Sequence, residues 1–122
     1  LQGGDFIIDE ITVYEIAPNF DWKRGAIGTA PVSFSARSFS NITYYDMSNF
    51  GTSMIADLIY DGISGVEGFV SEPYFESTAN PQILFGRYTS GYNLGDSFYM
   101  ASDNIGWKDI IIGDPKTVIV RY

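Results

Sequence analysis

The 122-residue sequence contains neither cysteine nor histidine. Without cysteine there are no thiol nucleophiles, disulfide bonds or cysteine–zinc sites, and without histidine there are no imidazole bases or imidazole metal ligands. Most catalytic constellations therefore cannot be built from this chain. We expect it to hold no catalytic residues, no metal and no cofactor of its own.

Positive charge is also scarce. Fifteen acidic residues face seven basic ones, which gives a formal net charge of −8. Nucleic acid and anionic membranes are bound by clustered lysine and arginine, so we expect neither as a partner. No apolar run approaches the roughly 20 residues of a membrane helix, which predicts no membrane insertion. The start, Leu1-Gln-Gly-Gly4, has no initiator Met and no basic signal-peptide region, so we expect a processed or truncated chain.

Strand and helix patterns alternate along the chain, which predicts an α/β fold. The predicted strands are 6–8, 11–16, 25–35, 66–70, 107–113 and 116–122, and the predicted helical segments are 52–60, 80–88 and 94–101. Such alternation favours a mainly parallel sheet flanked by helices, here with extra strands at the termini. No linker-like tract divides residues 1–122, so we expect a single domain or part of one.

The stretch Asp61–Tyr74 organises the rest of the chain. It follows the best-defined helix, in which Met54, Ile55, Leu58 and Ile59 fall on one stripe. Gly62 is placed to end that helix with a positive φ. Gly65 and Gly68 suit a strand whose backbone passes close to another part of the chain.

Polar side chains gather where two predicted strands end. Ser35 and Arg37 close the strand at 25–35, and Glu72 and Tyr74 follow the strand at 66–70. Ligands of open α/β sheets bind beyond the carboxyl ends of the strands, so these four residues are predicted to form a binding site. The alternative is a turn whose hydroxyls bond the backbone. Arg37 and Glu72 are expected to pair, either as a structural salt bridge or within the site.

Two other sites can be drawn from the acidic residues. A hydrolase could use paired carboxylates, as glycosidases do, drawn from Glu67, Glu72, Asp96 and Asp114. These acids are spread singly at predicted turns and caps, which favours structural roles. A calcium site near Asp103-Asn104 or Asp114 has no EF-hand spacing to support it.

Four segments, in order, carry a family resemblance. They are Trp22–Phe39, Ser53–Tyr74, Ser90–Tyr99 and Trp107–Pro115, and the Glu-Pro-Tyr and Gly-Asp-Pro pieces are the most specific. Together they resemble the C-terminal half of a family of exported prokaryotic proteins that are similar to gingipain-type, caspase-like cysteine peptidases. The resemblance implies a mainly parallel sheet sandwiched by helices, with a catalytic His and Cys at the ends of neighbouring strands. This chain has neither residue.

The resemblance implies that the chain follows the nucleophile in the caspase-like fold, where it helps to shape the substrate pocket. It would then be a non-catalytic C-terminal portion of an extracellular or cell-surface protein, and hydrolysis would need a second polypeptide that carries the N-terminal half. The alternative is an extracellular structural or interaction module that forms homo-oligomers through exposed strands. The lack of His and Cys and the acidic, aromatic composition favour that alternative.

Overall fold

The computed structural model describes residues 20–37, 39, 54–106 and 108–119. In these ranges the strands are β1 (Ile27–Thr29), β2 (Gly65–Phe69) and β3 (Asp109–Gly113). The helices are α2 (Met54–Tyr60), α3 (Pro81–Thr89) and α4 (Leu94–Ala101), with a 3-10 turn, η1, at Phe75–Ser77. The strands predicted at 6–8 and 11–16 lie outside the described residues.

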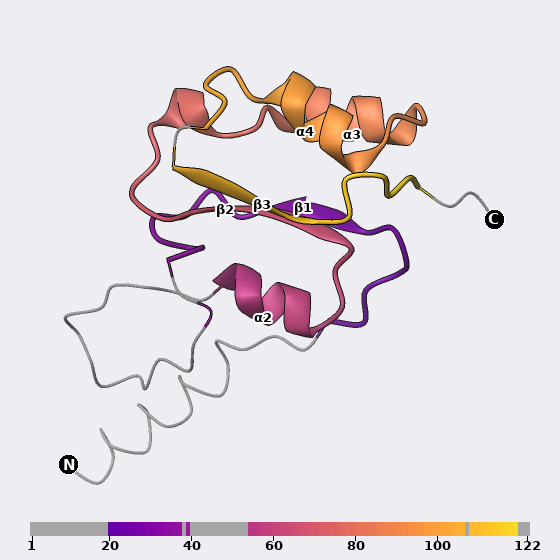
Figure 1. Cartoon of the computed structure of the whole chain (residues 1–122), viewed down its shortest axis with the longest axis horizontal. Helices are drawn as coiled ribbons and strands as arrows, with labels where there is room; N and C mark the ends of the chain where they lie inside the picture. The colour runs from indigo at the N-terminus through magenta and orange to yellow at the C-terminus, as the bar shows by residue number, and fades with distance from the viewer. Residues whose placement is uncertain (1–19, 38, 40–53, 107, 120–122) are drawn as a thin grey trace, which may run out of the picture.

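The three strands form one sheet in the order β1-β2-β3. The pair β1–β2 is parallel and places Thr29 opposite Glu67, whereas β2–β3 is antiparallel and places Glu67 opposite Ile111. Helix α2 covers one face of the sheet, and α3 and α4 cover the other (Figure 1). The predicted α/β class is confirmed. The expected mainly parallel character is not, since one of the two described pairings is antiparallel.

The direction of β3 follows from the two helices before it. The amide of Asn80, at the start of α3, donates to the carbonyl of Ala101, at the end of α4, at 2.8 Å. The helices therefore run out and back, and the chain returns to the end of the sheet at which β2 finished. From there a strand beside β2 must run antiparallel to it.

One hydrophobic core lies between α2 and the sheet. Its buried centre consists of Ile55, Val66, Ile63, Ala30 and Ala36, with Leu58, Ile59, Ile110 and Ile112 packed around it. The predicted apolar stripe of α2 therefore faces the sheet, apart from Met54, which is exposed. Gly62 follows the helix with φ of 97°, as predicted for its end.

A second core lies under α3 and α4. The helical spacing of Leu94, Phe98 and Ala101 predicts them as the inward stripe of α4, and all three are buried. Asn93, which the sequence predicts as the N-cap, accepts from the amide of Asp96 at 2.8 Å. For α3 the sequence pattern predicts Ile83, Leu84 and Phe85 as the buried face, which is partly wrong. Leu84 is buried together with Tyr88, one turn later, whereas Ile83 and Phe85 are exposed because a helix turns its neighbouring residues away from each other.

Two predicted strands differ from the expectation, and for the one predicted at 116–122 only residues 116–119 are described. Strand β1 has three residues, and residues 30–37 turn instead of continuing. Residues 116–119 form no strand, because this segment serves the start of α4. The carbonyls of Pro115 and Thr117 accept from the amides of Gly95 and Leu94 at 3.0 and 2.8 Å.

Candidate functional site

The carboxyl ends of β1 and β2 are joined by the turn at residues 30–37. In this turn, the amide of Ala36 donates to the carbonyl of Phe69 at 2.9 Å, and the amide of Phe34 donates to that of Ser71 at 3.3 Å. The turn is thereby held against the segment that follows β2. The two chain segments that carry the predicted site residues therefore do meet at one edge of the sheet.

Ser35 lies inside this edge and is fully buried. Its hydroxyl donates to the carbonyl of Ala30 at 2.9 Å and accepts from the amide of Phe69 at 3.0 Å. Its own carbonyl accepts from the amide of Ile55 at 3.2 Å, at the start of α2. Ser35 thus ties β1, β2 and α2 together, as in the turn alternative considered for its hydroxyl.

The other three predicted residues, Arg37, Glu72 and Tyr74, are exposed at the same edge. The guanidinium of Arg37 lies over the ring of Phe34, 5.2 Å from its centroid. Within the described ranges no ion pair joins Arg37 to Glu72. These residues therefore form an open polar and aromatic rim without the predicted salt bridge.

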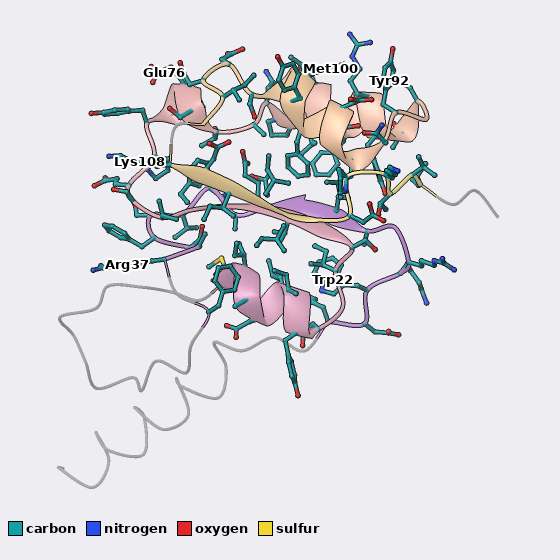
Figure 2. All side chains as sticks on the ribbon, viewed as in Figure 1. Trp22, Arg37, Glu76, Tyr92, Met100 and Lys108 are labelled. Carbon is teal, nitrogen blue, oxygen red and sulfur yellow. The ribbon has the colours of Figure 1, made fainter. Side chains whose placement is uncertain are left out.

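Backbone strain marks this rim. Phe34 and Lys108 have φ of 62° and 55°, and they are the non-glycine residues with positive φ in the described part of the chain. The amide of Phe34 bonds Ser71, and the carbonyl of Lys108 accepts from the amide of Val70 at 2.9 Å, so the two strained residues flank the end of β2. Figure 2 shows Arg37 and Lys108 at this end of the molecule. Strain of this kind gathers at ligand-binding sites, which makes the rim the candidate site.

Glu67 is the unexpected acidic residue. It stands in the middle of β2 with a relative exposure of 0%, not at a turn or cap as predicted. Its carboxylate accepts from the hydroxyl of Thr29 at 2.5 Å and from the amide of Ala79 at 3.3 Å. A glutamate alone within Gly65-Val-Glu-Gly-Phe69 was the available signal, because every neighbour in that strand is apolar or glycine.

A second carboxylate acts on Glu67 from β3. Burial raises the pKa of the Glu67 carboxyl, the two hydrogen bonds lower it, and the charge of Asp109 raises it again, for a net upward shift. The Oδ1 atom of Asp109 is itself buried without a hydrogen-bond partner among the described residues. Because burial disfavours the charged form of the Glu67 carboxyl, this side chain suits a structural role inside the sheet better than chemistry on a substrate.

Two further acids of the hydrolase and calcium alternatives serve a cap and a turn. Asp96 accepts from the side-chain amide of Asn93 at 2.8 Å, and Asp114 accepts from the amide of Lys116 at 2.9 Å. The side chain of Asn104 donates to the carbonyl of Glu76 at 3.3 Å. In the described part of the chain no three acidic residues are grouped as metal ligands.

The chain was compared with models of protein families, with curated proteins and with solved structures. None of the three comparisons found a match. The family resemblance therefore depends on the sequence motifs alone. A further finding concerns membranes: among the helices of the described ranges, none has the length and apolar character needed to span a bilayer.

Proposed function

We propose that this chain is the C-terminal, non-catalytic portion of an exported caspase-like protein, and that peptide hydrolysis requires a second polypeptide carrying cysteine and histidine. The observation that carries the proposal is the rim, where the ends of two parallel strands present exposed side chains. In open α/β sheets this edge is where ligands bind. The helices on both faces of the sheet agree with the sandwich that the resemblance implies.

In this proposal the rim contacts an extended peptide. Arg37 and Glu72 would select charged side chains, and the ring of Tyr74, with a relative exposure of 65%, would pack against an apolar one. Ser35 would not take part directly, because its hydroxyl is buried and already bonded on both sides. The role is therefore substrate positioning.

The second polypeptide has a place to join. Strand β1 pairs with β2 alone among the described strands. Alternate residues of β1 direct their N–H and C=O groups toward β2. Those of Ile27 and Thr29 therefore point to the outer edge of β1, away from β2. Strands of an N-terminal half would extend the sheet from that side.

Two measurements test the proposal. The isolated chain is incubated with a peptide library under reducing conditions, and the protein is isolated from its source for native and denaturing mass spectrometry. We expect no cleavage by the chain alone, and a complex with a polypeptide that contains Cys and His. Cleavage by the isolated chain would contradict the proposal. A species built of this chain alone would instead favour the self-assembling surface module.

A further inference from the structure

The outer edge of β3 carries backbone groups that no described residue bonds. The hydrogen bond from Val70 to Lys108 fixes the alternation of the antiparallel β2–β3 ladder. The residues of β3 that turn their N–H and C=O groups away from β2 are therefore Asp109, Ile111 and Gly113. No backbone bond to these outward groups occurs within the described ranges.

The side chains of β3 also have the exposure of an edge strand. All five residues of β2 are buried, whereas those of β3 are half-buried or exposed, with Ile111 at 39%. Figure 1 draws β3 at the front of the sheet, with no described helix or strand beyond it. Natural edge strands are usually protected by charges, proline or bulges. In β3 the charges stand at its first residue, Asp109, and at the flanks, and the three central positions are all isoleucine.

The sequence around this edge is complementary to its own reverse. It reads Lys108-Asp-Ile-Ile-Ile-Gly-Asp114. When a second copy runs antiparallel with Ile111 opposite Ile111, Lys108 stands opposite Asp114 and Asp109 opposite Gly113. Opposite charges therefore face each other at both ends of the paired strands. Asp109 faces a glycine, so its carboxylate opposes no other side chain.

The hydrogen-bonding geometry selects the same register. Outward groups must face outward groups, so only shifts by two residues are allowed. The central register bonds three pairs of residues, and a shift by two in either direction leaves two pairs. One direction places Asp109 opposite Ile111, and the other places Lys108 opposite Lys116. A shift by four brings Asp109 opposite Asp109, which is repulsive. Charge and hydrogen bonding therefore agree on Ile111 as the centre.

We propose that the chain forms a homodimer in which β3 pairs with β3 of a second copy. The two three-stranded sheets would become one continuous sheet of six strands, related by a twofold axis perpendicular to it. That operation keeps the α2 layers on one face and the α3–α4 layers on the other, so no helix crosses the interface. The proposal is independent of the peptidase relationship, because a second polypeptide at β1 leaves the β3 edge unchanged.

Cysteine cross-linking tests the centre of the interface. The chain has no cysteine, so Ile111→Cys introduces a single thiol, and opposed residues of a hydrogen-bonded pair lie about 5.5 Å apart at Cα, within disulfide reach. We expect mild oxidation to give a covalent dimer. The matched control is Ile105→Cys, on the loop before β3 and 60% exposed. If Ile111→Cys cross-links no faster than Ile105→Cys, the proposal is overturned. This holds even if another segment or protein covers the edge of β3.

Charge exchange tests the register. Sedimentation velocity over a concentration series should show that Lys108→Asp and Asp114→Lys each weaken dimerisation about tenfold, and that the two changes combined restore it. An effect of net charge alone would move the two single variants in opposite directions. Asp114→Asn, which keeps the acceptor for the amide of Lys116, controls for damage to the turn. A wild-type chain that stays monomeric throughout, or a double variant that stays as weak as the singles, would overturn the proposal.

Discussion

The hydroxyl of Thr29 on β1 donates a hydrogen bond to the buried carboxylate of Glu67 on β2. The second oxygen of that carboxylate accepts from the amide of Ala79, just before α3. One acidic side chain thus connects both parallel strands to the segment that enters the α3–α4 layer. Its protonation state should therefore affect the stability of the whole fold.

The raised pKa of Glu67 predicts a fold that weakens as pH rises. The carboxyl of Glu67 has a higher pKa in the folded chain than its ordinary value of 4.5. Its protonated form therefore adds to the free energy of unfolding fully below about pH 4.5, and this contribution is lost as pH rises through the folded pKa. Glu67→Gln keeps an acceptor for Ala79 and carries no charge. We expect it to stabilise the protein near pH 7 by about 1 kcal/mol, or roughly 4 °C in Tm, and to flatten the pH dependence.

The control for this prediction is Glu76→Gln, which removes an equal charge from the exposed turn η1. Thermal melts from pH 4 to pH 8 should show the steeper loss of stability with rising pH in the wild type and in Glu76→Gln. Equal slopes for Glu67→Gln and the wild type would show that Glu67 does not titrate in this range.

Close packing at β2 predicts a large effect of one methyl group. A Cβ atom on Gly68 would stand 2.6 Å from Cγ2 of Ile55 and 3.0 Å from Oγ of Ser35. Gly68→Ala must therefore push α2 or the 30–37 turn away from the sheet, at a cost of about 1–3 kcal/mol. Gly86→Ala is the matched control, since nothing lies within 4 Å of its Cβ position in α3. It should be neutral or stabilise by up to about 1 kcal/mol, measured by urea unfolding.

Ser35 predicts a stability effect of similar size. Ser35→Ala leaves the amide of Phe69 and the carbonyl of Ala30 without their side-chain partner inside the protein, which costs about 1–3 kcal/mol. Ser90→Ala removes one exposed hydroxyl bond to the carbonyl of Gly86 and should cost less than about 0.5 kcal/mol. If both variants melt alike, the buried hydroxyl is not the link between strands that the structure describes.

Local signals in the sequence were sufficient for part of this fold. Helix α4 was predicted because Leu94, Phe98 and Ala101 recur with the helical period and Asn93 is a good cap. Strand β2 and the close approach at Gly68 were predicted from the glycine spacing. In these cases neighbours in sequence decide the structure.

Contacts between distant residues decided the rest. The partners of Glu67, Thr29 and Ala79, are 38 and 12 residues away, so its burial follows from the assembled sheet and not from the local pattern. Strand β1 ends early because the 30–37 turn bonds the chain after β2, and β3 is antiparallel because α3 and α4 pair. Arg37, Glu72 and Tyr74 are exposed at the sheet edge that the sequence predicts for them, and their role in binding stays a prediction. The inward position of Ser35 depends on the positive φ of Phe34. A positive φ is rare for a bulky residue such as phenylalanine, so the sequence does not predict it.

In the described part of the chain no ion pair joins Arg37 to Glu72, so stability and binding at the rim can be tested separately. Glu72→Ala should leave the free energy of unfolding unchanged to within about 0.5 kcal/mol. Arg37→Ala should lower it by about 0.5–1 kcal/mol through the lost contact with Phe34. A double-mutant cycle on the free energy of unfolding should give no coupling between them. A coupling well above about 0.5 kcal/mol would show that the two side chains do form a salt bridge. If the proposed complex with a catalytic polypeptide is obtained, both single changes should raise its KM for charged peptides, whereas Glu76→Ala should not. Without a salt bridge, the two residues have in common only their position at the rim. A KM unchanged in both variants would therefore show that the rim does not bind substrate.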